Sequence, residues 1–182
     1  TWRNFVTANA DVVRVDDEWR LYFRANSKQE NGVANARIGL LTCPVENFDG
    51  VTWQEYAGNP VSQPGPPGSF DDFGALDPAI VVTEDRFLMY YTAVPQARPD
   101  AKKPPWGHFG KCIGLAVSDD GLRFERWGDQ PLLPEFSGAP EVVHHDGEYF
   151  MFYSALDARG GTDICLVRST DPYHFDHTQR QI

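Results

Sequence analysis

A pattern that occurs three times along the chain constrains the fold more than any other sequence feature. Each copy has a short apolar segment, an acidic or glycine turn, a long aromatic segment ending in alanine, an Ile-led segment, and a turn before a further aromatic residue. In every copy the second segment begins seven positions after the same place in the first, as in Val12 and Trp19, Ile80 and Phe87, and Val142 and Tyr149. A register shared in this way indicates three copies of one supersecondary unit.

The residue types within each copy predict strands. The segments Phe87–Ala93 and Tyr149–Ala155 are apolar at both odd and even positions, which suits a sheet covered on both faces by neighbouring sheets. The 14 prolines and 16 glycines interrupt every window in which a helix could form. Four antiparallel strands per copy are typical of the blades of a β-propeller, so we predict an all-β chain.

The blades are expected at about 9–62, 77–134 and 139–182, within one domain spanning residues 1–182. Propellers generally close with about four to eight blades, so three cannot complete a ring. Two arrangements remain open. Either the chain is part of a five-bladed propeller whose C-terminal blades are missing here, or two copies form a homodimer with a six-bladed ring.

Composition excludes several classes of partner. A formal net charge of -10 would repel a nucleic-acid backbone. No apolar run approaches the roughly 18 residues of a membrane helix, so a soluble protein without a membrane partner is expected. The chain begins with Thr1 rather than Met, which leaves both a cytoplasmic location and secretion with a signal removed open. Three cysteines without CxxC spacing predict neither a disulfide framework nor a zinc site, and we expect them to be buried strand residues.

Several motifs resemble the five-bladed glycoside hydrolases of families 43, 32 and 130. Asp77-Pro78 precedes an aromatic strand ending Tyr91-Thr92-Ala93, and Ile113–Gly121 follows. Further details resemble family 130, namely Asn9-Ala10, Phe23-Arg24-Ala25, Asn59-Pro60-Val61 and Gly74–Pro78. Ala139-Pro140 ahead of Tyr149–Ala155 is similar to family 43 instead. The likeness spans nearly the whole chain and is specific for the superfamily rather than for one family.

Three acidic residues are the candidate catalytic groups. The first strands of propeller blades line the central channel, so we expect Asp11, Asp77 and Glu141 to converge at one mouth. Cleavage of a glycosidic bond uses a paired acid and base, and converging carboxylates raise one another's pKa so that one can remain protonated. The resemblance implies that Asp77 is either the pKa-tuning residue of family 43 or the catalytic acid of family 130. It also implies that two family 43 carboxylates are replaced here, by Asn9 and by Gly138, which leaves Glu141 and Asp11 as candidate acid and base.

Candidate substrate-binding residues are mostly aromatic, because sugars stack on aromatic faces. They are Trp2, Asn9, Phe73, Trp106 and His108. Trp106 and His108 lie in the long loop 95–110, and the loop 63–73 is of similar character; such loops are commonly functional, although both could instead shield a sheet edge. We expect no cofactor and no catalytic metal, and the only ion left open is a structural Ca²⁺ on the propeller axis.

The sequence therefore predicts a glycoside hydrolase-like protein that acts on a small oligosaccharide or glycoside. Two alternatives stay open. A family 130-like phosphorylase would use basic residues to hold phosphate near Asp77, and a suitable set is Arg98, Lys102, Lys103, His108 and Lys111. A non-catalytic carbohydrate-binding or interaction module is favoured by Asn9 and Gly138, which stand where family 43 would carry carboxylates.

Overall fold

The described part of the chain is built almost entirely of β-strands. A computed structural model describes residues 2–28, 34–96, 110–134, 136–157 and 159–182. Within these residues the helical elements are two short 3-10 turns, η1 (Val45–Asn47) and η2 (His177–Gln179). The predicted all-β class is thereby confirmed. None of the helices described is long and apolar enough to cross a membrane.

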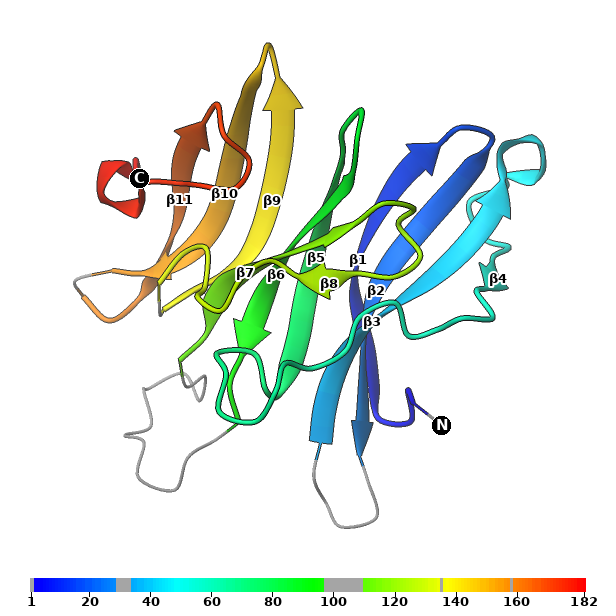
Figure 1. Ribbon diagram of the computed structural model, residues 1–182, viewed down its shortest axis with the longest axis horizontal. Coiled ribbons are helices and arrows are strands. Elements are labelled where there is room, and N and C mark those ends of the chain that lie inside the picture. The colour runs from blue at the N-terminus through cyan, green and yellow to red at the C-terminus, as the bar shows by residue number, and fades with distance from the viewer. Residues whose placement is uncertain (1, 29–33, 97–109, 135, 158) are drawn as a thin grey trace.

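The strands form three groups that follow one another along the molecule, with the N-terminus in the first group and the C-terminus in the third (Figure 1). The first two groups are joined by a parallel bridge between Ala36 and Gly74, and the third forms a sheet of its own. The first group holds β1 (Val6–Val15), β2 (Glu18–Lys28), β3 (Ala34–Pro44) and β4 (Gln54–Glu55). The second holds β5 (Gly74–Val82), β6 (Phe87–Val94), β7 (Cys112–Ser118) and β8 (Glu125–Arg126), and the third holds β9 (Ser137–His145), β10 (Glu148–Leu156) and β11 (Thr162–Ser169).

The strand register reproduces the spacing of the sequence repeat. Consecutive strands within each group pair antiparallel, and equivalent residues of the three copies occupy equivalent places. The pairs are Val12 with Leu21, Ile80 with Met89, and Val142 with Met151. The repeat therefore corresponds to a unit of structure, with β1, β5 and β9 as its first strands.

The third group departs from the expected pattern at its end. The repeat predicts a fourth strand in each copy, but in the third group the residues after β11 form η2 and an isolated bridge between Leu166 and Gln181. Phe175 is buried and packs edge-on against Tyr90, at 6.1 Å between ring centroids, so it anchors a turn. Asp176 then accepts a hydrogen bond from the backbone N–H of Thr178 and caps η2. The number of blades in a complete ring, and four strands in each, stay predictions.

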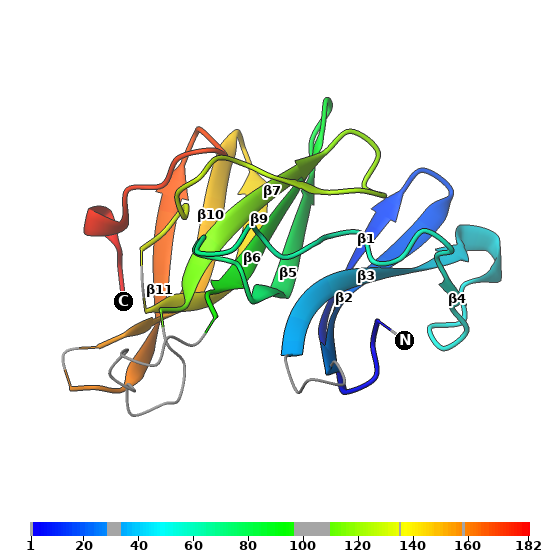
Figure 2. The same cartoon turned by 60° about the horizontal axis from the view of Figure 1, so that its bottom comes forward.

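Two apolar clusters lie between the groups, and β6 contributes to both. Met89 and Tyr91 join the cluster that faces the first group, whereas Leu88 and Tyr90 join the one that faces the third. Figure 2 shows the groups packed in this order. The prediction that this strand is apolar on both faces because it lies between two sheets is confirmed.

The outer face of the third group is different. This face carries three exposed apolar side chains, Val143 at 48%, Phe152 at 41% and Ile164 at 72%, together with the exposed charged residues Glu141 and Arg168. The buried partners Met151 and Tyr153 belong to the opposite face of β10. Cys43, Cys112 and Cys165 are all buried in strands, as predicted.

Candidate active site

Each first strand contains a β-bulge at the same place. The bulged residue has a left-handed backbone in all three strands, with φ of 47° at Asn9, 49° at Asp77 and 49° at Ala139. Residues other than glycine adopt this conformation at a cost, and bulges re-aim side chains next to functional sites. Of the three equivalent positions, Asp77 alone carries a carboxylate. Asp11 and Glu141 lie two residues beyond their bulges, so they are equivalent to each other but not to Asp77.

The Asp77 carboxylate is held by a relay that crosses to the third group. The hydroxyl of Thr92 on β6 donates to Oδ2 of Asp77 at 2.9 Å. The same hydroxyl accepts the backbone N–H of Ala139 on β9 at 2.7 Å. Thr92 is completely buried, whereas Asp77 is half-buried. One buried hydroxyl therefore links the bulge of β5 to the bulge of β9.

Lys111 lies in the electrostatic surroundings of Asp77 and also of Arg24. Lys111, just before β7, is half-buried, and this burial lowers the pKa of its ammonium group. The negative charge of Asp77 opposes that shift, and the positive charge of Arg24 on β2 adds to it. Arg24 in turn donates from Nε to Oδ1 of Asn26 at 2.7 Å. Asp77 and Arg24 thus act on the charge of Lys111 in opposite directions.

Asp11 on β1 and Glu141 on β9 form a second pair of carboxyl groups, which interact electrostatically. Oδ2 of Asp11 accepts the backbone N–H of Ile80 on β5 at 2.6 Å. Burial raises the pKa of Asp11, although the hydrogen bond from Ile80 limits the rise. Glu141 is exposed on β9, but partial burial of its carboxyl raises the pKa, and the negative charge of Asp11 raises it further. Asp11 and Glu141 therefore interact electrostatically, whereas the convergence of Asp11, Asp77 and Glu141 at one mouth stays a prediction.

The predicted substrate-binding residues are distributed differently. Trp2 packs on Phe23, with ring centroids 5.9 Å apart, on the face of β2 that points away from the second group. Phe73 is half-buried, and its backbone bridges the first two groups: its N–H donates to Val94 and its carbonyl accepts from Ala36, both at 3.0 Å. Asn9 is exposed at the bulge of β1. Trp106 and His108, with Arg98, Lys102 and Lys103, lie outside the described residues.

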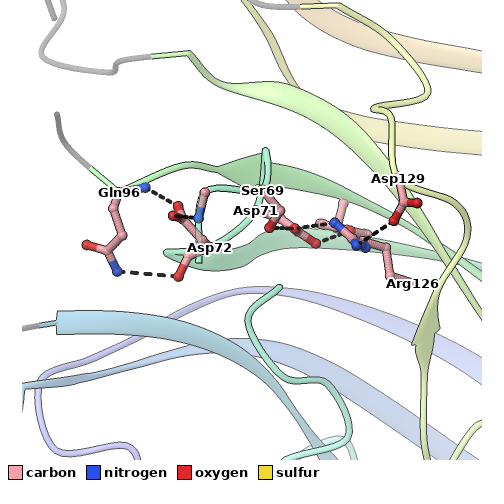
Figure 3. Close-up of polar contacts among 8 residues, drawn as sticks. Ser69, Asp71, Asp72, Gln96, Arg126 and Asp129 are labelled. Carbon is pink, nitrogen blue, oxygen red and sulfur yellow. Dashed lines mark hydrogen bonds and ion pairs between the residues drawn. The ribbon is translucent and has the colours of Figure 1, made fainter. Parts of the chain in front are cut away.

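A buried ion pair that sequence reasoning missed holds the loop before β5 (Figure 3). Asp71 accepts hydrogen bonds from the hydroxyls of Tyr91 and Ser69, at 2.9 and 2.7 Å, and pairs with Arg126 at 3.1 Å. Its side chain is only 5% exposed. The next residue, Asp72, accepts the backbone N–H of Gln96. These contacts give the loop 63–73 a structural role, because they fix the path of the chain that enters β5 and leads to Asp77.

The same loop borders a cleft of about 550 Å³ between residues 56–66 and 122–126. Among its described lining residues are Asp71 and Arg126, but not Asp11, Asp77 or Glu141. In the part of the chain that the structure describes, no group of three or more His, Cys, Asp or Glu side chains is arranged to hold a metal ion. The axial Ca²⁺ ion therefore stays an expectation without a ligand set.

Comparison with known proteins agrees with this architecture. Uncharacterized protein MT1551 of Mycobacterium tuberculosis is 30% identical over 176 residues, which cover 90% of this chain and 54% of that protein. A β-1,2-mannobiose phosphorylase of Thermoanaerobacter is 28% identical over 127 residues, or 62% of this chain and 40% of the phosphorylase. The chain therefore spans about half the length, or less, of these relatives. No protein-family model matches it.

Solved structures of glycosidases share the fold. A family 117 glycoside hydrolase from Zobellia galactanivorans superposes with a TM-score of 0.69 at 13% identity, over 95% of this chain and 55% of that one. The family 32 β-fructofuranosidase of Bombyx mori gives 0.64 at 17% identity, over 94% of this chain and 36% of the enzyme. The likeness of fold to the β-propeller glycosidases that the motifs indicated is thereby confirmed.

Proposed function

We propose that the chain carries the carboxyl groups of a glycosidase active site and cleaves a glycosidic bond in a small oligosaccharide or glycoside by acid/base catalysis. The observation that carries this proposal is the position of Asp77 at the left-handed bulge of β5, where the Thr92 hydroxyl holds one oxygen of its carboxylate. Asp77 lies on β5, the first strand of the second group, whereas Asp11 lies on β1 of the first group and Glu141 on β9 of the third. Cleavage through an oxocarbenium-like transition state needs one carboxyl group that holds a proton and one that does not.

The surroundings of each group suggest its role. Glu141 is the proposed acid, because burial and the charge of Asp11 both favour its protonated form. Asp11, a candidate base from sequence, has one oxygen committed to the N–H of Ile80, and we propose that it tunes Glu141 instead. Asp77 is the proposed base, since one of its oxygens accepts the Thr92 hydroxyl hydrogen and Lys111 lies nearby.

A phosphorylase is the second candidate, and the two cations favour it. Arg24 and Asp77 both lie close enough to Lys111 to influence its pKa. A phosphate ion would relieve the repulsion between the two cations. The relative from Thermoanaerobacter is itself named a phosphorylase, which supports testing phosphate as a co-substrate.

The deciding experiment incubates the chain with a panel of aryl glycosides and disaccharides, with and without inorganic phosphate. We expect free sugar from the wild type, and a loss of about 10²- to 10⁴-fold in Asp77→Asn and in Glu141→Gln. Asp119→Asn is the matched control, because the Asp119 side chain is 93% exposed in a hairpin turn. Sugar phosphate formed only with phosphate would establish the phosphorylase, and sugar binding without turnover would overturn the catalytic proposal in favour of a binding module.

We also propose that the exposed face of the third group is covered in the functional protein. Val143, Phe152 and Ile164 form an apolar surface, and soluble monomers rarely leave a large surface of this kind open. Further C-terminal blades and a second copy of the chain would both cover it. The chain spans only about half the length of these similar proteins, which is compatible with either arrangement.

A further inference from the structure

Thr92 lies where the second and third groups meet, and the direction of its hydrogen bonds is determined by its partners. A hydroxyl group has one hydrogen to donate and two lone pairs to accept with. The Ala139 N–H can only donate, so it occupies a lone pair of Oγ1 at 2.7 Å. The Asp77 carboxylate can only accept, so it receives the hydroxyl hydrogen at 2.9 Å. The relay therefore runs from Ala139 through Thr92 to Asp77.

We infer that Thr92 is a positioning residue for Asp77, which fixes one carboxylate oxygen and leaves the other to meet the substrate. This inference rests on the proposed function of Asp77. The bulge places the Asp77 side chain away from the regular sheet, where a carboxylate without a partner could adopt several rotamers. Thr92 restricts that choice from a completely buried position. Because the relay begins on β9, the orientation of Asp77 also depends on how the third group packs on the second.

The packing around Thr92 gives independent support. A Cβ atom added at Gly138 would lie 3.2 Å from Cγ2 and 3.3 Å from Oγ1 of Thr92. Glycine therefore allows β9 to approach closely enough for the bond from Ala139. The resemblance to family 43 would place a glutamate at position 138. Here that position is Gly138, whose backbone packs against Thr92.

The test compares two substitutions of Thr92. Thr92→Val keeps the shape of the side chain but removes the hydroxyl, whereas Thr92→Ser keeps the hydroxyl. We expect Thr92→Val to lower kcat about 10²-fold with KM unchanged, since misplacing a catalytic group by about 1 Å has such an effect. Thr92→Ser should retain most of the wild-type kcat.

Thr83→Val is the matched control. Thr83 also donates one hydrogen bond, to the carbonyl of Arg86 at 2.9 Å, and accepts one, from its N–H at 3.0 Å. It lies in the hairpin at the other end of β5 and β6, so kcat should stay at the wild-type value. An equal loss of kcat in Thr83→Val and Thr92→Val would show a general effect on folding and overturn the positioning role.

A second measurement separates this inference from the proposed function. A crystal structure of Thr92→Val should show the Asp77 carboxylate in a different rotamer, and this readout does not require a known substrate. An unchanged rotamer would overturn the positioning role, whereas a changed rotamer in a protein that cleaves no glycoside would overturn the proposed function alone. If Thr92→Val does not fold, Gly138→Ala takes its place, because it presses on Thr92 without removing the hydroxyl. Wild-type kcat and an unmoved Asp77 in Gly138→Ala would then refute the inference.

Discussion

Asp11 offers the sharpest test of the electrostatic reasoning, because its hydrogen bond to the N–H of Ile80 connects the first two groups at 2.6 Å. Replacing Asp11 with leucine would leave that N–H without its carboxylate acceptor. Hydrogen bonds to charged groups generally contribute about 1.5–3 kcal/mol. Burial raises the pKa of Asp11, so part of this gain is offset by the cost of burying the charge. We therefore expect Asp11→Leu to lose about 1–2 kcal/mol of unfolding free energy.

Urea denaturation measures this loss. With an m-value of about 2 kcal/mol/M, the midpoint of Asp11→Leu should fall by about 0.5–1 M relative to the wild type. Asp11→Asn keeps an acceptor oxygen at the same place without a charge, so its midpoint should remain close to the wild-type value. If the asparagine and leucine variants lose the same stability, the bond to Ile80 does not contribute as argued.

Three further predictions concern other parts of the molecule. Burial and the charge of Asp11 raise the pKa of Glu141 in the folded protein, so the contribution of its carboxyl to stability is fully present below the unfolded pKa and is lost as pH rises through the folded pKa. Glu141→Gln should therefore have the melting temperature of the wild type near pH 3 and a higher one at pH 7. Equal melting temperatures of the two proteins at both pH values would contradict the coupling. Arg126→Met leaves Asp71 buried without its cation and should reduce the unfolding free energy by about 3–5 kcal/mol, so an unchanged urea midpoint would count against a structural role for this pair. In sedimentation, the purified chain should self-associate or be poorly folded, and Ile164→Glu should disperse any dimer; a well-folded wild-type monomer at micromolar concentration would refute the proposal that this face is covered.

The sequence by itself determined the strands, their order and their register. These properties depend on short-range alternation of side chains and on a spacing that recurs within each copy, and both can be read from neighbouring residues. Val12, Ile80 and Val142 accordingly occupy equivalent places in the structure. The exception is the region after β11, where Phe175 packs into the core and the chain turns instead of forming a strand.

Only the tertiary structure decided how the carboxyl groups are arranged. The bulges at Asn9, Asp77 and Ala139 change which residues are equivalent, and the alternation of apolar and polar residues does not show where they fall, although Asn and Asp are enriched at positive φ. The contacts of Asp77 with Thr92, and of Thr92 with Ala139, join three strands from two groups. The Asp71–Arg126 pair likewise connects residues 55 positions apart. Such contacts follow from how whole sheets pack against one another, so local periodicity predicts the strands but not the environment of the groups they bring together.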